Sequence, residues 1–300
     1  MIPLEQRPDP ALPPAELRAL AAAGLKSPRT VWQQLVRSPT FLVGAAIALF
    51  WIVCAVFGSS IAPDNPLAQQ LLAVNAHPSG AHLFGTDALG RDVLSRVIVG
   101  ARNILIIAPM ATALGTVLGT ALGLVMGYFG GAVDAIVGRI VETLLALPLI
   151  IVTLLFVLAL GPTLPTLIVV IGIVFAPLIA RTVRAAVLGE RQLDYVAAAQ
   201  LRGDSALRIM FVEILPNVLA PILVEFTVRI GYAIFTVATL SFLGLGPPLP
   251  TPDWGSDISQ SYGLLSAGYW WETLFPALAI ASLVIAVNLI ADSVESALTA

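Results

Sequence analysis

The sequence has little charge, little cysteine and little histidine. Only 11% of its 300 residues are charged and 58% are hydrophobic, whereas soluble domains carry about 25% charged residues. This deficit excludes an ordinary water-soluble core and favours several membrane spans of about 20 apolar residues each, in contact with lipid. The net charge of -3 does not favour nucleic acid as a partner.

The few reactive residues limit the kinds of site. Cys54 lies alone in an apolar run, so neither a disulfide framework nor a thiolate metal site is expected. His77 and His82 share one polar loop without a cysteine; we interpret them as surface residues and predict no metal site. The chain also lacks the G-x-x-x-x-G-K-[ST] phosphate loop. We therefore predict no catalytic residue and no directly bound cofactor.

The apolar runs predict an all-α polytopic membrane protein, because a backbone in lipid must satisfy its own hydrogen bonds. Residues 1–27 contain five prolines and no apolar signal core, so we expect a flexible cytosolic tail before one transmembrane domain over residues 28–300. Six spans are predicted, at residues 41–61, 103–128, 135–160, 164–180, 218–245 and 274–291.

Six spans place both termini on one side of the membrane. With that side inside, eleven of the 15 basic residues lie in the tail and the inner loops. Because cytoplasmic loops are enriched in Lys and Arg, this distribution favours N-in, C-in.

Two flanking segments are amphipathic. "SPRTVWQQLVRSP" places Val31, Trp32, Leu35 and Val36 on one face, and "GRDVLSRVIVGAR" does the same with Val93, Leu94, Val97, Ile98 and Ala101. We expect two elbow helices at the membrane surface. In the second, Asp92 and Arg96 have the i,i+4 spacing of an ion pair.

Span two carries a ladder of glycines at every fourth residue. Small residues on one helix face allow two backbones to approach closely in lipid. A packing face within the chain is the main interpretation, and a contact between subunits is the alternative. The ladder comprises Gly115, Gly119, Gly123 and Gly127.

Two charges fall in the middle of span five. Glu225 and Arg229 are four residues apart, so one helix face holds both. Charged side chains in a membrane are costly and usually face protein or a water-filled cavity. They line a translocation path or form a self-neutralising pair against a partner, and both interpretations stay open. Asn288 in span six is a weaker candidate of the same kind.

The segment "LDYVAAAQLRGDSALRIMFVEILPN" (193–217) interrupts the apolar runs on the side predicted to be cytosolic. It favours a helix, a turn at Gly203 and a second helix capped by Asp204 or Ser205. Without a phosphate loop, a transport subunit needs an external motor, and this segment is a suitable handle. A secondary transporter or channel-like protein without ATPase partners is the alternative, although no internal repeat supports it.

The same segment resembles the EAA motif of bacterial ABC importer permeases, through Ala197-Ala198-Ala199, Gly203 and Leu215-Pro216. "HLFGTDALGRDVLSRVIVGAR" (82–102) and "LSFLGLGPPLPTPDWG" (240–255) resemble the C-type permeases of the dipeptide, oligopeptide and nickel branch. The resemblance covers about residues 28–291.

The resemblance implies a type I importer permease fold and a place in the bacterial cytoplasmic membrane. It implies a homologous permease as a heterodimer partner, two cytosolic ATPases that hold ATP and Mg²⁺, and an extracytoplasmic binding protein. The loop at residues 190–216 would couple to an ATPase. The implied coupling residues are Asp194, Tyr195, Ala197, Ala198, Ala199, Leu201, Arg202, Gly203 and Asp204.

This chain departs from the family pattern at three positions. Ala197 stands where the motif usually has glutamate, Glu213 where isoleucine is common, and Val237 where a glutamate often precedes the "SFLGLG" run. We therefore expect the handle to be gripped by shape more than by charge.

Overall fold

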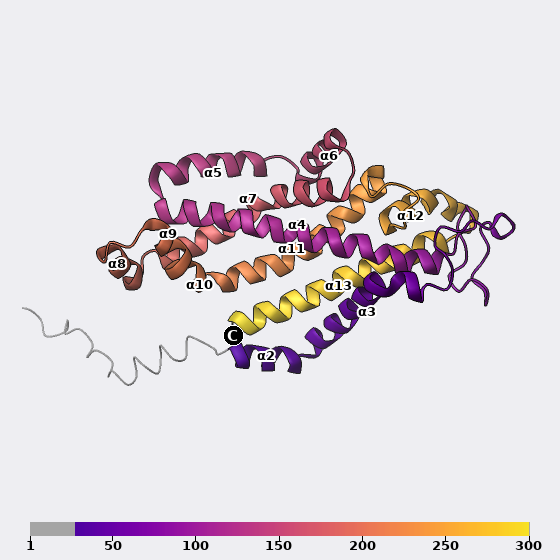
Figure 1. The fold of residues 1–300 in the computed structure, drawn as a ribbon, viewed down its shortest axis with the longest axis horizontal. Helices are drawn as coiled ribbons and strands as arrows, with labels where there is room; N and C mark the ends of the chain where they lie inside the picture. Colours follow the sequence, from indigo (N-terminus) through magenta and orange to yellow (C-terminus); the bar gives the residue numbers. More distant parts are fainter. Residues whose placement is uncertain (1–27, 300) are drawn as a thin grey trace, which may run out of the picture.

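The computed structural model describes residues 28–299 and the side chains of residues 33–298. The prediction for the tail at residues 1–27 lies outside this part of the chain. The described chain is helical, and long helices run side by side along one axis (Figure 1). The long helices are α3 (Pro39–Ile61), α4 (Val93–Phe129), α7 (Leu164–Glu190), α11 (Leu219–Leu240) and α13 (Trp271–Thr299).

Shorter elements join these helices. α2 (Pro28–Arg37) precedes α3, and α5 (Gly131–Leu145) and α6 (Leu149–Leu160) lie between α4 and α7. α8 (Asp194–Leu201) protrudes at one end of the molecule, whereas α12 and the loop before α4 form the other end (Figure 1). The remaining elements are η1 (Leu71–Ala73), α9 (Ala206–Arg208), η2 (Ile209–Ile214), α10 (Leu215–Asn217), η3 (Ser241–Leu245), α12 (Trp254–Ser261) and η4 (Tyr262–Ala267).

The described residues contain five or six candidate membrane spans, against the six predicted. Five helices are long and apolar enough to cross a membrane, and α5 with α6 makes a sixth candidate that is bent by 85°. The span predicted at residues 135–160 is thus represented by two helices with a bend between them. Pro148 precedes α6 and cannot donate a backbone hydrogen bond, so the chain turns there.

Two helices extend beyond the spans predicted within them. Residues 93–102 are not a separate surface helix, because they form the first turns of the continuous helix α4. α7 continues beyond Ala180 to Glu190 and carries Arg181 and Arg184 on its last turns.

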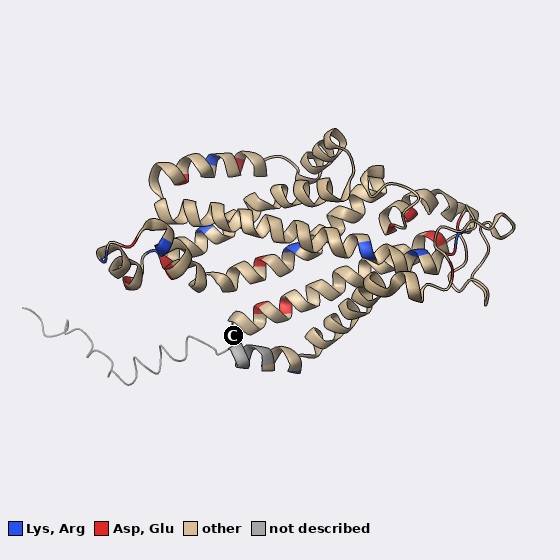
Figure 2. Cartoon of the chain, in the orientation of Figure 1, with Lys and Arg blue, Asp and Glu red and all other residues tan. Residues whose placement is uncertain are grey.

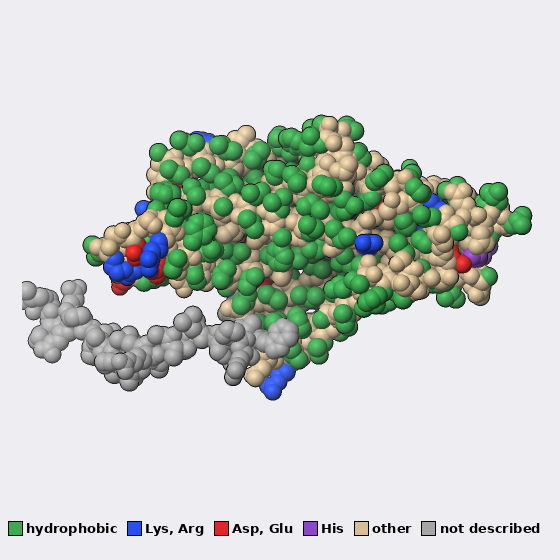
Figure 3. Space-filling view, in the orientation of Figure 1, with side chains coloured by type: hydrophobic (Ala, Val, Ile, Leu, Met, Phe, Trp, Pro, Cys, Tyr) green, Lys and Arg blue, Asp and Glu red, His purple; other side chains and the backbone are tan. Residues whose placement is uncertain are grey.

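The surface chemistry matches a membrane protein. Apolar side chains cover the sides of the bundle in the view shown (Figure 3), and most charged residues lie towards its two ends (Figure 2). The buried core follows α4 and α7, which pack together along most of their lengths. This pair forms the frame on which the polar sites below are placed.

Candidate functional site

The handle predicted from the sequence is a short helix at one tip of the molecule. Three residues separate the end of α7 from the start of α8. Val196 and Ala199 are fully buried against the body, whereas Ala197 and Ala198 are exposed. Leu201, in the last turn, is 90% exposed. One face of α8 therefore anchors the helix and the other faces outward.

Gly203 ends the helix as expected, with φ of +76°. This left-handed conformation suits glycine and disfavours other residues. The next short helix is capped by Ser205, whose Oγ accepts a hydrogen bond from the Arg208 backbone N–H at 3.3 Å. Asp204, the other predicted cap, instead accepts from Arg202 at 2.9 Å. Arg202 also contacts Glu213 at 3.0 Å, so the turn is braced from within the chain.

Tyr195 ties the base of the handle to both of its flanks. Its hydroxyl donates to Glu190 at 2.7 Å and accepts from the Asn217 amide at 3.3 Å. Burial raises the pKa of Tyr195 to about 12, and the nearby Glu190 carboxylate adds to this shift. The hydroxyl therefore remains a proton donor at neutral pH. Asp194 lies exposed in the first turn of α8.

The two charges in α11 form the expected pair. Arg229 Nε donates to Glu225 Oε1 at 2.6 Å, and both side chains are less than a fifth exposed. The guanidinium carbon lies 5.4 Å from the ring centroid of Tyr232. Asn288 lies on α13, opposite Gly231 of α11: a Cβ at that glycine would be 2.8 Å from the Asn288 amide oxygen. Gly231 is two residues from Arg229 and six from Glu225, so the amide lies within two turns of the charge pair along α11.

The glycine ladder packs within the chain. A Cβ at Gly119 would lie 2.7 Å from the Ala176 carbonyl, and one at Gly123 would lie 2.6 Å from Val183 Cβ. Gly115 and Gly127 face α7 in the same way, against Gly172 and Val187. The within-chain interpretation is the one that this packing supports.

The end opposite α8 joins the two stretches that carry the branch-specific resemblance. Trp254 Nε1 donates to the Val97 carbonyl at 2.8 Å, and Gly100 leaves room for the indole. Arg96 is 2% exposed and forms a bidentate pair with Asp257 of α12. Burial raises the pKa of Asp257 to about 6, although the charge of Arg96 acts in the opposite direction.

The predicted pair of Asp92 with Arg96 is therefore wrong. Asp92 caps α4 and accepts from the Ser95 backbone N–H at 2.8 Å, so its carboxylate is already in use. His82 is also not a free surface residue, because its side chain is only 12% exposed and contacts Asp92. Sequence spacing could not find the partner of Arg96, which lies 161 residues away.

Comparisons with known proteins cover most of the chain. Residues 119–299 match the family described as "Binding-protein-dependent transport system inner membrane component", and residues 29–78 match the "N-terminal TM domain of oligopeptide transport permease C". The dipeptide transport system permease protein DppC of Escherichia coli K12 is 43% identical over 273 residues, which are 89% of this chain and 91% of that protein.

Two further relatives have similar coverage. The di/tripeptide transport system permease protein DppC of Pseudomonas aeruginosa UCBPP-PA14 is 37% identical over 89% of this chain and 90% of its own length. The dipeptide transport system permease protein DppC of Bacillus subtilis 168 is 36% identical over 94% of this chain and 88% of its own length.

Proposed function

The chain belongs to the binding-protein-dependent transport inner membrane components, as a DppC/OppC-like permease subunit of an ABC importer, and on that premise we propose that it moves short peptides by coupling to ATPases through α8. The names of the relatives from Escherichia coli and Pseudomonas aeruginosa support peptide as the cargo. The chain contributes one half of the path and no catalytic group.

The proposed partners complete the transporter. A homologous permease supplies the other half of the path, two cytosolic ATPases hold ATP and Mg²⁺, and an extracytoplasmic binding protein delivers the peptide. Five arginines lie between residues 181 and 208, on the last turns of α7 and in the segment that contains α8, which supports a cytosolic position for this end. The membrane is the bacterial cytoplasmic membrane, with both termini inside.

The exposed face of α8 is the observation that carries this proposal. Ala197 and Ala198 let a partner backbone approach, and Leu201 offers an apolar side chain that the body leaves 90% exposed. No carboxylate stands at position 197, so a groove that fits the helix by shape explains docking better than an ion pair at that position.

The connection from α8 to the bundle is short and braced. Force on α8 passes through the three-residue link and the hydrogen bond from Tyr195 to Glu190 into α7. α7 is in turn packed against α4 through the glycine ladder. ATP-driven closure of the ATPases would thus move two spans together and change which side of the membrane the path faces. The pair Glu225–Arg229, with Asn288, is our candidate polar lining of that path.

The test uses the complete transporter reconstituted in liposomes with its ATPases and binding protein. Ala198→Arg places a long charged side chain on the docking face, and Gly203→Pro imposes a φ near -65° where the turn needs a positive value. We expect each to lower peptide uptake about tenfold or more, equivalent to ~1.4 kcal/mol of docking free energy.

Ala198→Ser is the matched control, because it keeps a small side chain at the same position and should retain uptake. Insertion of every variant is checked by its yield in the membrane fraction. Normal uptake in Ala198→Arg, or a wild-type permease that co-purifies with no ATPase, would contradict coupling through α8.

A further inference from the structure

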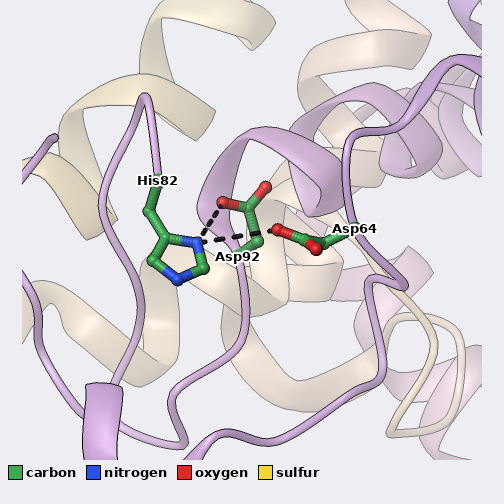
Figure 4. Close-up of side chains that lie close together, drawn as sticks. All are labelled: Asp64, His82 and Asp92. Carbon is green, nitrogen blue, oxygen red and sulfur yellow. Dashed lines mark hydrogen bonds and ion pairs between the residues drawn. The ribbon is translucent and has the colours of Figure 1, made fainter. Parts of the chain in front are cut away.

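Three side chains that are far apart in the sequence meet near the start of α4. His82 Nδ1 lies 3.1 Å from Asp92 Oδ1 and 3.7 Å from Asp64 Oδ2 (Figure 4). Asp64 follows the end of α3, His82 lies in the connecting loop, and Asp92 is the N-cap of α4. All three ligand atoms lie within 4.8 Å of one another.

The backbone and neighbouring hydroxyl groups hold this arrangement in place. Ser95 Oγ donates to Asp92 Oδ2 at 2.7 Å and accepts from the Asp64 backbone N–H at 3.0 Å. The His82 carbonyl accepts from the backbone N–H groups of Ser79 and Gly85 at 2.8 and 2.9 Å. Asp92 therefore directs its second oxygen at the imidazole, and the loop holds the backbone of His82 in place.

The charge of this group is unbalanced. Two carboxylates face one imidazole nitrogen, and among the described residues neither Asp64 nor Asp92 forms an ion pair with Lys or Arg. The nearby Arg91 and Arg96 pair with other aspartates, Asp87 and Asp257. Asp92 is 4% exposed, so water screens its charge poorly. A neutral imidazole leaves a net charge of about -2, which a divalent cation cancels.

We propose that Asp64, His82 and Asp92 bind one divalent first-row transition-metal ion of the Zn²⁺ type. Zn²⁺ binds nitrogen and carboxylate oxygen at about 2.0–2.2 Å, so tetrahedral ligand atoms lie roughly 3.3 Å apart. The observed separations of 3.1 and 3.7 Å from His82 Nδ1 bracket this value. The imidazole ligand favours such an ion over Mg²⁺ and Ca²⁺, which prefer oxygen. Water completes the fourth position.

The ion would join the two ends of the connection between α3 and α4. Asp64 and Asp92 bound this connection, and η1 is the one helical segment within it. A ligand that binds only the folded chain stabilises it by RT ln(1 + [L]/Kd). The bound ion therefore fixes a loop whose side chains at Leu71 and Leu72 are strongly exposed. This site does not depend on the proposed cargo or on α8.

The experiment titrates Zn²⁺ into the full-length protein in detergent after treatment with a chelator. Calorimetry and metal analysis after dialysis should give one ion per chain, with an increase in Tm. His82→Gln and Asp64→Asn should each weaken binding about tenfold or more and abolish the increase in Tm. His77→Gln is the matched control, because His77 lies in the same loop, packs against Trp271 with the two rings tilted by 49°, and is not one of the three proposed ligands.

Size-exclusion profiles identify any variant that fails to fold. Asp64 is 40% exposed at its side chain, so Asp64→Asn keeps the test valid if the more buried His82 does not tolerate change. Equal Zn²⁺ binding by the wild type and both variants, or no binding at millimolar Zn²⁺, overturns the proposal. Tighter binding of Ca²⁺ than of Zn²⁺ overturns the assigned class of ion.

Discussion

At the scale of single residues, the charge pair in α11 limits its own cost. A lone charged side chain in the centre of a membrane costs about 2.5–3.5 kcal/mol on insertion scales. Glu225 and Arg229 share one helix face and a 2.6 Å hydrogen bond, so neither charge stands alone. The guanidinium carbon of Arg229 also lies 5.4 Å from the centroid of the Tyr232 ring. The pair can therefore lie in an apolar helix without a partner subunit.

The pairing is tested by exchanging the two charges. Glu225→Arg or Arg229→Glu alone places two like charges four residues apart, and each should lower the yield and peptide uptake of the assembled transporter about tenfold or more. The double exchange restores an opposite pair on the same face and should recover a large part of both. Failure of the double variant to improve on either single variant would argue against the pair.

The sequence offered this pair as one of two interpretations and missed the partner of Arg96, for one physical reason. Spacing along a helix finds a partner only when neither side chain has a stronger interaction elsewhere. Glu225 and Arg229 lie in an apolar helix, and they form an ion pair with each other. Asp92 is used by the N-terminus of α4, so Arg96 turns to Asp257 of α12. Such a choice depends on tertiary packing.

At the scale of elements, α4 and α7 pack closely because the residues of α4 at their contact are glycines, which have no side chain. A Cβ at Gly119 would meet the Ala176 carbonyl and Ile179 Cβ at 2.7 Å each, closer than real Cβ atoms approach. In lipid this packing, and not a hydrophobic drive, holds two helices together. Even one methyl group would therefore separate their backbones.

Gly119→Ala is expected to lower Tm and uptake, with a destabilisation of roughly 1–3 kcal/mol from overpacking. Gly189→Ala is the matched control, because no atom lies within 4 Å of its Cβ position in α7. Alanine is also the better helix former by about 1 kcal/mol. Thermal unfolding of the two purified variants measures the difference, and an equal Tm for both would contradict the packing role of the ladder.

The positions of the helices along the sequence were predicted more accurately than the directions in which the helices run. The apolar composition of residues 135–160 indicates that they suit lipid. Composition does not determine the direction of the chain, so it could not predict the 85° bend between α5 and α6. The charged residues after Ala180 suggested a loop, but α7 continues as a helix to Glu190. Arg184 stays helical there and donates to Asp134 of α5 at 2.5 and 2.6 Å. A long-range ion pair of this kind cannot be read from local sequence.

At the scale of the whole molecule, one buried ion pair joins the first and last thirds of the chain. Arg96 of α4 and Asp257 of α12 are both at least nine-tenths buried. Removing one member of a buried pair leaves an uncompensated charge, whereas replacing both with apolar residues can be nearly neutral. The pair thus connects the two stretches that carry the branch-specific motifs.

Asp257→Ala should destabilise the protein by roughly 3–5 kcal/mol, while the double variant Arg96→Met/Asp257→Leu should lose much less. The comparison of Tm is made at pH 8, above the pKa of about 6 of Asp257, where the wild-type carboxylate is charged. A double variant less stable than Asp257→Ala would show that the pair adds specific stability beyond filling the space.

The glycine contact also has a mechanical consequence. Pro177 lies inside α7, where proline removes a backbone hydrogen bond and weakens a helix. Its neighbour Ala176 is the residue whose carbonyl faces Gly119. α4 therefore packs against α7 beside this proline. The 37 residues of α4 extend about 55 Å. A rigid tilt of α4 by a few degrees about the end near α8 would therefore displace its other end, beside Asp92, by several ångströms.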